Sequence, residues 1–378
     1  MQSQPITPDI KTQHSNDFGA VNANGQRLVD KQDKFIHFVS LHEELGPAVS
    51  RLPVELLSEI FIHTLAQFDE LLPPSKLRSP MLLTRICRRW REVAVGTPGL
   101  WCRLFSGFTS THRMQQEAFC YDTWLKRSQG LPLLLAVTRF PDLLLLTGLL
   151  EPYMNQISSL HIVCYFVTRK LLLNDLPALQ VLTMDGYIDF YRFKSNTIAE
   201  SILKHSFTLR SLKISAQAFY FVDVDPFKNT RWPHLTHVEI TVLHQNIFLA
   251  LLQQAPNLSS AKIMIFSSYN MPPGPTLPAE PFTHENLQFL DIECNTSVTL
   301  LPDILNALSL SNLRHFRAAF AWTQWPHEEF EAFLVRSECP LEYLEFGDGK
   351  RTMPKLIERR AEYFALIPSL VVHYTRPS

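Results

Sequence analysis

The chain has 378 residues, with 35 Lys and Arg against 36 Asp and Glu, so its formal net charge is -1 at pH 7. This balance argues against a general nucleic-acid-binding protein, which normally concentrates a basic excess on one face. The length is sufficient for two or three structural units with a substantial core.

The six cysteines include no CxxC pair and no Cys/His cluster at zinc-ligand spacing, which predicts reduced, mostly buried thiols. The N-terminus lacks the basic start and apolar core of a secretory signal. Prolines and charged residues interrupt the most apolar window, 131–150, which argues against a membrane span. We therefore expect a soluble protein of the cytoplasm or nucleus, with no nucleic-acid or membrane partner.

The N-terminal part divides into two segments. Residues 1–25 are rich in Gln, Ser, Asn and Thr, and this composition predicts a disordered arm. In residues 26–49, apolar side chains recur at helical spacing up to Gly46, which predicts a helix. The pattern lasts less than three heptads, so packing against the following module is favoured over a coiled-coil dimer.

Residues 50–106 predict a small helical module. Leu52, Leu56, Leu57, Ile60 and Phe61 form one apolar face of a first helix, with Pro53 in its first turn. A second helix is predicted from about Pro80 to Gly96, after a proline-containing loop. Cys87 falls on the apolar stripe of this second helix, so we expect its thiol to be buried and unreactive. A module of about 55 residues often completes its core on a partner.

Three phrases of this module, LPVELLSEIF, LLTRICRRWREVA and TPGLW, resemble an F-box. The match is with the F-box-like form that is common in mushroom-forming fungi. The resemblance implies that the module docks on the adaptor subunit of an SCF ubiquitin ligase, and through it on the cullin and RING subunits. The rest of the chain would then select the protein to be ubiquitinated and degraded. The adaptor-facing residues implied are Leu52, Pro53, Leu56, Leu57, Ile60, Leu82, Ile86, Cys87, Trp90 and Trp101.

A linker follows at 107–130, with a helix predicted over 115–128. Residues 131–378 then open with an apolar run of strand length, LPLLLAVT.

One phrase, apolar-x-x-apolar-x-apolar, recurs eight times in this C-terminal part. The copies begin at Ile157, Leu179, Leu209, Leu235, Leu258, Leu287, Leu313 and Leu341. Successive copies are 22 to 30 residues apart, which is the length of one leucine-rich repeat. Helical segments are predicted in the intervals at 197–205, 248–254, 302–308 and 327–336. A unit of one strand and one helix cannot bury its own apolar face, so neighbouring units must stack.

The repeats resemble an irregular leucine-rich repeat domain, a frequent companion of an F-box. The expected fold class is α+β or α/β, with the helical F-box-like module followed by a solenoid of strand–helix repeats. A helix at 353–367 and the strand LVVHY are expected to cap it. The asparagine or cysteine that usually follows each strand occurs only at Asn295, so no asparagine ladder is expected. The proline-rich loop 267–281 is either inert or part of a binding surface.

The variable positions within the strand phrases are expected to line a concave, target-binding face. The target-binding candidates are Arg210, Lys213, His237, Glu239, Phe289, Asp291, Arg314 and Tyr343. They belong to a wider set that also includes His315, Glu342 and Glu345. Their mixed charges favour a protein partner over a polyanion.

The chain lacks the common catalytic motifs, including a glycine-rich phosphate loop, GxSxG and HExxH. The acidic pair Asp223 and Asp225 has no neighbouring histidine, which argues against a metal site. We therefore expect a non-catalytic protein without a cofactor, whose ligase activity comes from recruited subunits. Two functions fit the sequence: a substrate receptor of an SCF-type ubiquitin ligase, or a non-catalytic leucine-rich repeat scaffold that acts outside any ligase.

Overall fold

The structure is a computed structural model with two compact units, Met1–Thr64 and Leu65–Ser378. It describes residues 51–65, 77–107, 114–138, 148–164, 176–186, 196–215, 227, 229–265, 280–294, 300–320, 325–348, 362–364, 367 and 371–374. The predictions for residues 1–49, Asp223, Asp225, Asn295, most of the proline-rich loop and most of the cap helix therefore lie outside the described residues. None of the helices in the described part is long and apolar enough to cross a membrane.

The described part of the first unit is built on helix α2 (Val54–His63), which confirms the first predicted helix. Pro53 stands immediately before it, where the missing backbone N–H has no helical partner to lose. The Pro53 carbonyl accepts a hydrogen bond from the Leu57 N–H at 3.1 Å, which closes the first turn. Leu57 and Phe61 are fully buried and lie on one side of the helix.

The second predicted helix is divided in two at Cys87, giving α3 (Leu83–Ile86) and α4 (Arg88–Val95). Cys87 has an extended backbone, with φ -151° and ψ 172°, and its sulfur accepts a hydrogen bond from the Trp90 N–H at 3.4 Å. A residue that caps a helix must leave the helical conformation. Cys87 does so, and its side chain no longer lies on the buried apolar face predicted for this helix. Cys87 is exposed, so the expectation of a buried thiol was wrong.

The expectation of mostly buried cysteines holds only in part. Among the cysteines whose burial is described, Cys102, Cys294 and Cys339 are buried, whereas Cys87 and Cys120 are exposed. Burial raises the pKa of the Cys294 thiol to about 12 and that of Cys339 to about 11. These two thiols are therefore protonated and unreactive at neutral pH.

A strand begins inside the stretch predicted to be purely helical. After the short 3-10 helix η2 (Pro98–Trp101), strand β1 (Arg103–Gly107) pairs in parallel with β2 (Leu133–Thr138). Helix α5 (Met114–Lys126) connects the two strands and confirms the predicted linker helix. The sheet therefore starts at Arg103, before the position 131 at which we expected the repeats to start.

Trp101 fixes α4 and α5 at this end of the sheet. Its indole Nε1 donates to the Ala94 carbonyl of α4 at 2.8 Å. Its ring meets that of Trp124 edge to face, with centroids 5.0 Å apart. The Arg127 guanidinium lies 4.3 Å from the centre of the Trp101 ring.

The second unit is a mixed α/β structure with one parallel sheet of eleven strands among its described residues. The strands lie in the order of the sequence, and only β8 and β10 are left out of this sheet. After β2 they are β3 (Ile157–Cys164), β4 (Val181–Gly186), β5 (Ser211–Ile214), β6 (His237–Val242), β7 (Ser260–Ile265), β9 (Phe289–Cys294), β11 (His315–Phe320), β12 (Tyr343–Asp348) and β13 (Val371–Tyr374). Each of the eight predicted phrases forms a strand, as do LPLLLAVT and LVVHY.

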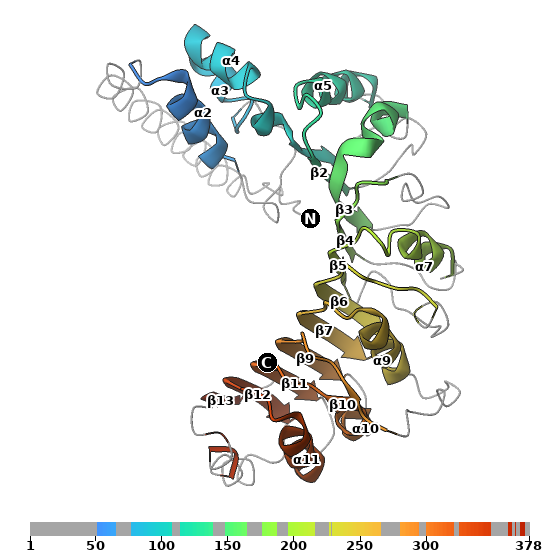
Figure 1. Cartoon of the computed structure of the whole chain (residues 1–378). Coiled ribbons are helices and arrows are strands. Elements are labelled where there is room, and N and C mark those ends of the chain that lie inside the picture. Colours follow the sequence, from blue (N-terminus) through green and yellow to red (C-terminus); the bar gives the residue numbers. More distant parts are fainter. Residues whose placement is uncertain are drawn as a thin grey trace, which may run out of the picture. The chain divides into compact units, whose positions relative to one another are not determined.

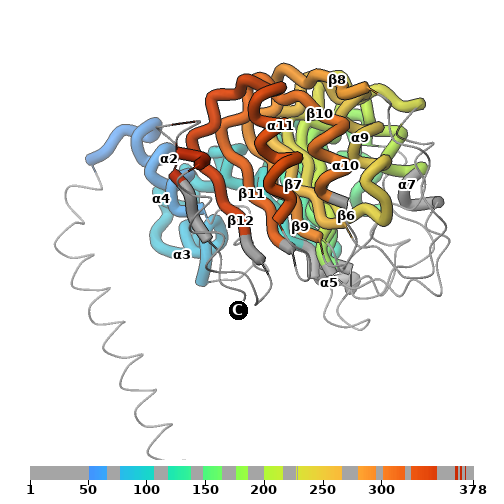
Figure 2. Tube along the Cα trace, turned by 90° about the horizontal axis from the view of Figure 1, so that it is seen from below, coloured from blue at the N-terminus to red at the C-terminus, as the bar shows by residue number. Residues whose placement is uncertain are grey.

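Helices cover one face of this sheet (Figure 1). They are α7 (Asn196–Leu203), α9 (Gln245–Gln254), α10 (Leu300–Ala307) and α11 (His327–Ser337), and they confirm the four helices predicted between strands. Figure 2 shows α9, α10 and α11 side by side along this face. A further 3-10 helix, η4 (Glu151–Gln156), precedes β3.

Alternation along each strand separates the core from the opposite face. In β7, every second residue is buried, namely Ala261, Ile263 and Ile265. The equivalent Phe316 of β11 packs on Phe330 of α11 with ring centroids 5.3 Å apart, so the buried side chains point toward the helices. The other face, which bears the remaining strand side chains, is called the open face below.

The C-terminal end of the sheet carries an aromatic cluster. Residues 362–364 are helical, and Tyr363 among them is fully buried. The Trp325 indole donates to the Tyr363 hydroxyl at 2.7 Å, and that hydroxyl lies 2.8 Å from His327 Nδ1. This packing agrees with the predicted cap in the part of it that is described.

A short second sheet was not predicted. Strands β8 (Phe282–Thr283) and β10 (Leu308–Ser309) pair in parallel over two residues each. Strands of this length have no periodicity that a sequence pattern could reveal.

Asparagine side chains connect successive turns, but not at the position after the strand to which our expectation referred. The Nδ2 groups of Asn257, Asn286 and Asn312 donate to the carbonyls of Pro233, Pro256 and Glu285 at 2.7, 2.9 and 2.6 Å. Each asparagine stands directly before the first apolar residue of a strand phrase, whereas the expectation considered only positions after the strand. Each amide thus ties its own turn to the turn of the preceding repeat.

Replacing these asparagines should destabilise the stacked turns. We expect Asn286→Ala to lower the free energy of unfolding by about 1 kcal/mol, and replacement of all three to cost more, since each change removes one cross-turn hydrogen bond. Urea denaturation of the full chain measures the effect. Asn306→Ala is the matched control because Asn306 is exposed on α10 and makes no such bond. Equal stability of the triple variant and this control would contradict the role assigned to the ladder.

Candidate functional site

Helix α2 presents an exposed apolar face. Val54, Leu56 and Ile60 are 51%, 53% and 47% exposed, respectively. Leu56 and Ile60 are four residues apart and therefore adjacent on the helix surface. Large apolar side chains grouped in this way are typical of an interaction surface.

The other residues that the F-box resemblance assigns to an adaptor differ in exposure. Pro53 and Cys87 are exposed, whereas Leu52, Leu82, Ile86 and Trp90 are half-buried. Leu57 and Trp101 are fully buried, so their side chains are not available at the surface of this chain. They therefore belong to the buried core of the chain.

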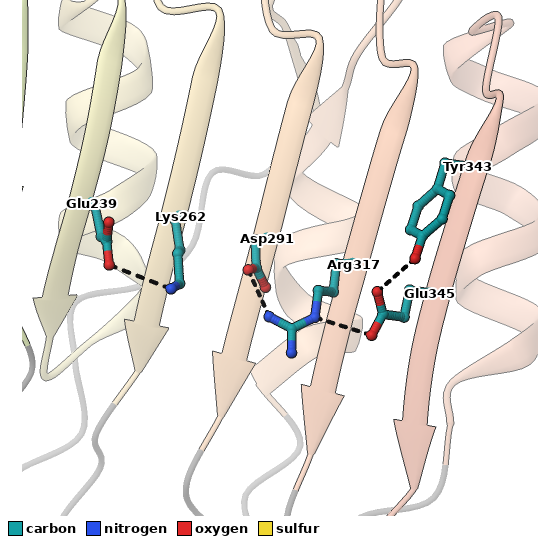
Figure 3. A network of polar contacts seen from close by, with 6 residues as sticks. All are labelled: Glu239, Lys262, Asp291, Arg317, Tyr343 and Glu345. Atoms are coloured by element: carbon teal, nitrogen blue, oxygen red, sulfur yellow. Dashed lines mark hydrogen bonds and ion pairs between the residues drawn. The ribbon is translucent and has the colours of Figure 1, made fainter. Parts of the chain in front are cut away.

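The open face of the second unit carries a row of charged residues. The strand register places Lys213, Glu239, Lys262, Asp291, Arg317 and Glu345 at the same level of β5, β6, β7, β9, β11 and β12. We call this set the charged row; Figure 3 shows its members from Glu239 to Glu345. Its charges alternate in sign along the row, which avoids the repulsion of like charges on adjacent strands.

The first half of the charged row is a lysine triad, made of Lys213, Glu239 and Lys262. The two Glu239 oxygens lie 3.2 Å from Lys213 Nζ and 3.3 Å from Lys262 Nζ. One carboxylate therefore serves two ammonium groups, and the triad keeps a net charge of +1.

The second half is an arginine triad, made of Asp291, Arg317 and Glu345. Arg317 Nη1 donates to Asp291 Oδ2 at 2.9 Å, and its Nε donates to Glu345 Oε1 at 3.3 Å. The Tyr343 hydroxyl donates to Glu345 Oε2 at 2.8 Å, which fixes this carboxylate (Figure 3). One guanidinium serves two carboxylates, so this triad has a net charge of -1.

Burial makes the arginine triad the stronger of the two. The Asp291 side chain is only 4% exposed and that of Arg317 is 34% exposed. Burial of Arg317 opposes its charge, but its hydrogen bonds to and attraction by Asp291 and Glu345 outweigh this effect and raise its pKa. The pKa of Tyr343 is also raised, through burial and through its contact with Glu345. Asp291 Oδ1 is buried without a hydrogen-bond partner among the described residues.

An aromatic row lies beside the arginine triad, two residues earlier in each strand. It consists of Phe289, His315 and Tyr343, which are register partners on β9, β11 and β12. The ring centroids of Phe289 and His315 are 6.3 Å apart, and those of His315 and Tyr343 are 5.8 Å apart. Phe289 is 37% exposed, so the row offers aromatic surface to a ligand.

The eight predicted target-binding residues all lie in or next to these rows. Lys213, Glu239 and Asp291 are in the charged row, and Phe289 and Tyr343 are in the aromatic row. The remaining three are His237, which is at the level of the aromatic row, and Arg210 and Arg314, which directly precede their strands. Arg314 forms an ion pair with Glu342.

Lys262 and Arg317 were not among the residues predicted from the sequence. Both stand between the last two apolar residues of a strand phrase, which is also the position of Lys213, Glu239 and Asp291. Aligning the phrases and comparing the charge at that one position would have found them.

A separate polar pair lies on β3 and β4 of the open face. His161 Nε2 lies 2.7 Å from Asp185 Oδ2, and the hydrogen bond from His161 is the main cause that lowers the pKa of Asp185. A carboxylate with a lowered pKa stabilises the fold above its usual pKa, and this contribution is lost as the pH falls through the lowered value. No group of three His, Cys, Asp or Glu side chains in the described part of the chain could hold a metal ion.

Comparison with known proteins adds no relative: no family model matches the chain, and none of the curated proteins matches it.

Removal of Arg317 should be costly because it leaves the buried Asp291 carboxylate unpaired. We expect Arg317→Met to lower the free energy of unfolding by about 2 kcal/mol, and the double change with Asp291→Asn to recover part of the loss. Urea denaturation at neutral pH measures both variants.

Arg314→Met is the matched control. Arg314 and its partner Glu342 are 48% and 51% exposed, so the control should cost less than about 1 kcal/mol. Equal losses for the two arginine variants would show that burial of the triad has no energetic consequence.

Proposed function

We propose that the chain is a substrate-recognition subunit of an SCF-type ubiquitin ligase, acting in the cytoplasm or nucleus. In this proposal the F-box-like module binds the adaptor, the repeat domain binds a target protein, and the recruited cullin and RING subunits supply the ligase activity. The exposed apolar pair Leu56 and Ile60 is the observation that carries the proposal. It lies within LPVELLSEIF, the first of the three phrases that resemble an F-box.

The form of the second unit supports the recognition half of the proposal. We infer that its parallel strands and one-sided helices form an irregular leucine-rich repeat solenoid. Three features fit such repeats: the strands are parallel and follow the order of the sequence, one strand phrase occurs every 22 to 30 residues, and asparagines connect successive turns. The open face then offers a polar surface of mixed charge, which suits a protein target.

The mechanism that follows is one of proximity. A receptor that holds the adaptor with its F-box-like module and the target with its repeat domain raises the concentration of the target near the ubiquitin-charged enzyme. No side chain of this chain needs to form a covalent bond. The rate of ubiquitination then depends on how long the target remains bound.

Loss of the exposed apolar pair should weaken capture of the adaptor. We expect Leu56→Ala combined with Ile60→Ala to weaken binding of the purified SCF adaptor by about tenfold or more, because both side chains would be buried at the interface. Surface plasmon resonance with the immobilised full chain measures the affinity.

The matched control combines Glu55→Ala with Glu59→Ala, two exposed positions of the same helix. It should retain binding, because it leaves the apolar pair in place. If the unaltered chain captures no adaptor, the receptor proposal fails and the scaffold function is left.

Two exposed cysteines allow a footprint of the same interface. Cys87 is among the adaptor-facing residues that the resemblance implies, whereas Cys120 lies on α5, outside that set. Addition of the adaptor should slow alkylation of Cys87 by about tenfold and leave Cys120 unchanged, since a desolvated interface excludes the reagent. Mass spectrometry of iodoacetamide-treated chain gives both rates. Equal rates at Cys87 with and without adaptor would place the interface elsewhere.

A further inference from the structure

The lysine triad is an accessible site of positive charge. Its side chains are 48%, 31% and 44% exposed for Lys213, Glu239 and Lys262. An acidic side chain from outside can therefore reach the triad, whose net charge of +1 is offset in part by Asp185, the partner of His161, which also interacts electrostatically with Lys213. Arg210, exposed directly before β5, adds a further positive charge at this end of the row.

The arginine triad is a site of opposite sign. Its net charge of -1 is reinforced by Glu293, which lies two residues beyond Asp291 on the same face of β9 and forms no ion pair with a described residue. Asp291 Oδ1 has no hydrogen-bond partner among the described residues, but it is buried, so it adds to the negative potential of the site and is not an accessible acceptor. A basic side chain is the group that this combination attracts.

The aromatic row favours a cation at the same end. Phe289, His315 and Tyr343 border the arginine triad, and a guanidinium or ammonium group near the face of an aromatic ring gains a further attraction. The lysine triad has only the imidazole of His237 at the corresponding level, because Ser211 and Ser260 occupy the equivalent positions on β5 and β7. The two ends of the row therefore differ in charge and in aromatic content.

The distance between the two triads follows from the sheet. Glu239 and Arg317 stand at the centres of their triads, on β6 and β11, and these strands are three steps apart in the order β6-β7-β9-β11. At about 4.8 Å for each step, the centres are roughly 14 Å apart. An extended chain advances about 3.3 Å per residue, so it covers this distance in about four residues.

We propose that the open face binds an extended segment that carries an acidic and a basic side chain about four residues apart, the acid on the lysine triad and the base on the arginine triad. The inference rests on the proposed function only in regarding the bound protein as a ubiquitination target. Binding itself depends on the open face alone. The segment crosses the strands, so its specificity comes from charge spacing and not from added strand pairing.

Synthetic peptides test the proposal on the full chain. The main probe is a fluorescein-labelled peptide of about eight residues with one Asp and one Arg about four positions apart in a Gly-Ser background. Three further probes carry two Asp, two Arg, or the Asp and Arg at adjacent positions. Fluorescence anisotropy at low salt should give an affinity about tenfold higher for the main probe than for the other three, because only the main probe reaches both triads with matching charge.

Substitutions in each triad should remove this preference. Lys213→Gln with Lys262→Gln, and separately Glu345→Gln, should each weaken binding of the main probe by about tenfold. In the second variant the new side-chain amide keeps an oxygen that accepts from Arg317, so the charge changes with little change of shape. Arg231→Gln and Glu331→Gln, at exposed positions outside the charged row, are the controls and should bind as the unaltered chain does.

Each outcome decides between the alternatives. Equal or tighter binding of the two-Arg probe would overturn the pairing of opposite charges, and tighter binding of the two-Asp probe would do the same. Absence of binding by all four probes, with thermal melting that shows a folded chain, would overturn the inference. If adaptor capture succeeds and the probes fail, only this inference falls; if the probes bind and adaptor capture fails, the ligase proposal falls and the binding site stands.

Discussion

The register of the parallel sheet is the constraint on which the rest of the second unit depends. Neighbouring strands keep the same level, so that Leu182, Leu212, Val238, Ala261 and Leu290 follow one another as a continuous buried column. A slip of one residue in any strand would turn its apolar side chains toward the open face. The same register brings charged residues that are 23 to 29 positions apart in the sequence to adjacent places, and their alternating signs make that arrangement tolerable.

Much of this fold could be predicted because apolar periodicity is a local signal. Each strand phrase and each intervening helix leaves a pattern within a few residues, and all eight phrases became strands. The errors arose where local pattern and structure separate. At Cys87 the apolar pattern of the sequence continues, although the helical backbone is interrupted. A thiol cap is a weak signal within a sequence that otherwise favours helix, so the interruption was not predicted. Strand β1 depends on its pairing with β2, in which Arg103 lies beside Leu134, thirty-one residues further along the chain. No periodicity within Arg103–Gly107 predicts this strand.

The candidate surfaces were predictable to different degrees. The exposed apolar residues of α2 follow directly from its sequence, because the apolar surface of this helix is wide. Leu57 and Phe61 are buried on one side of that surface, and the rest is exposed. Trp101 could not be assigned in this way, because an aromatic residue in a turn gives no indication of whether it packs inward or outward. The charged row was found only in part, since the candidates were chosen one strand at a time. Its organisation into two triads is a property of several strands together, and it appears only when their register is known.

The alternation of charge has a consequence for how such a chain can change in length. Each strand of the charged row touches only its two neighbours, so a repeat could be duplicated or deleted without disturbing the hydrogen bonding of the others. The alternating signs of the charges, however, require that strands be gained or lost in even numbers. Gain or loss of a single charged strand, such as that of Lys262, would bring two residues of equal charge together, whereas gain or loss of a pair would not. Repeats of this region are therefore expected to be duplicated or deleted in pairs. The pattern of charge repeats every two strands, whereas the structural repeat contains one.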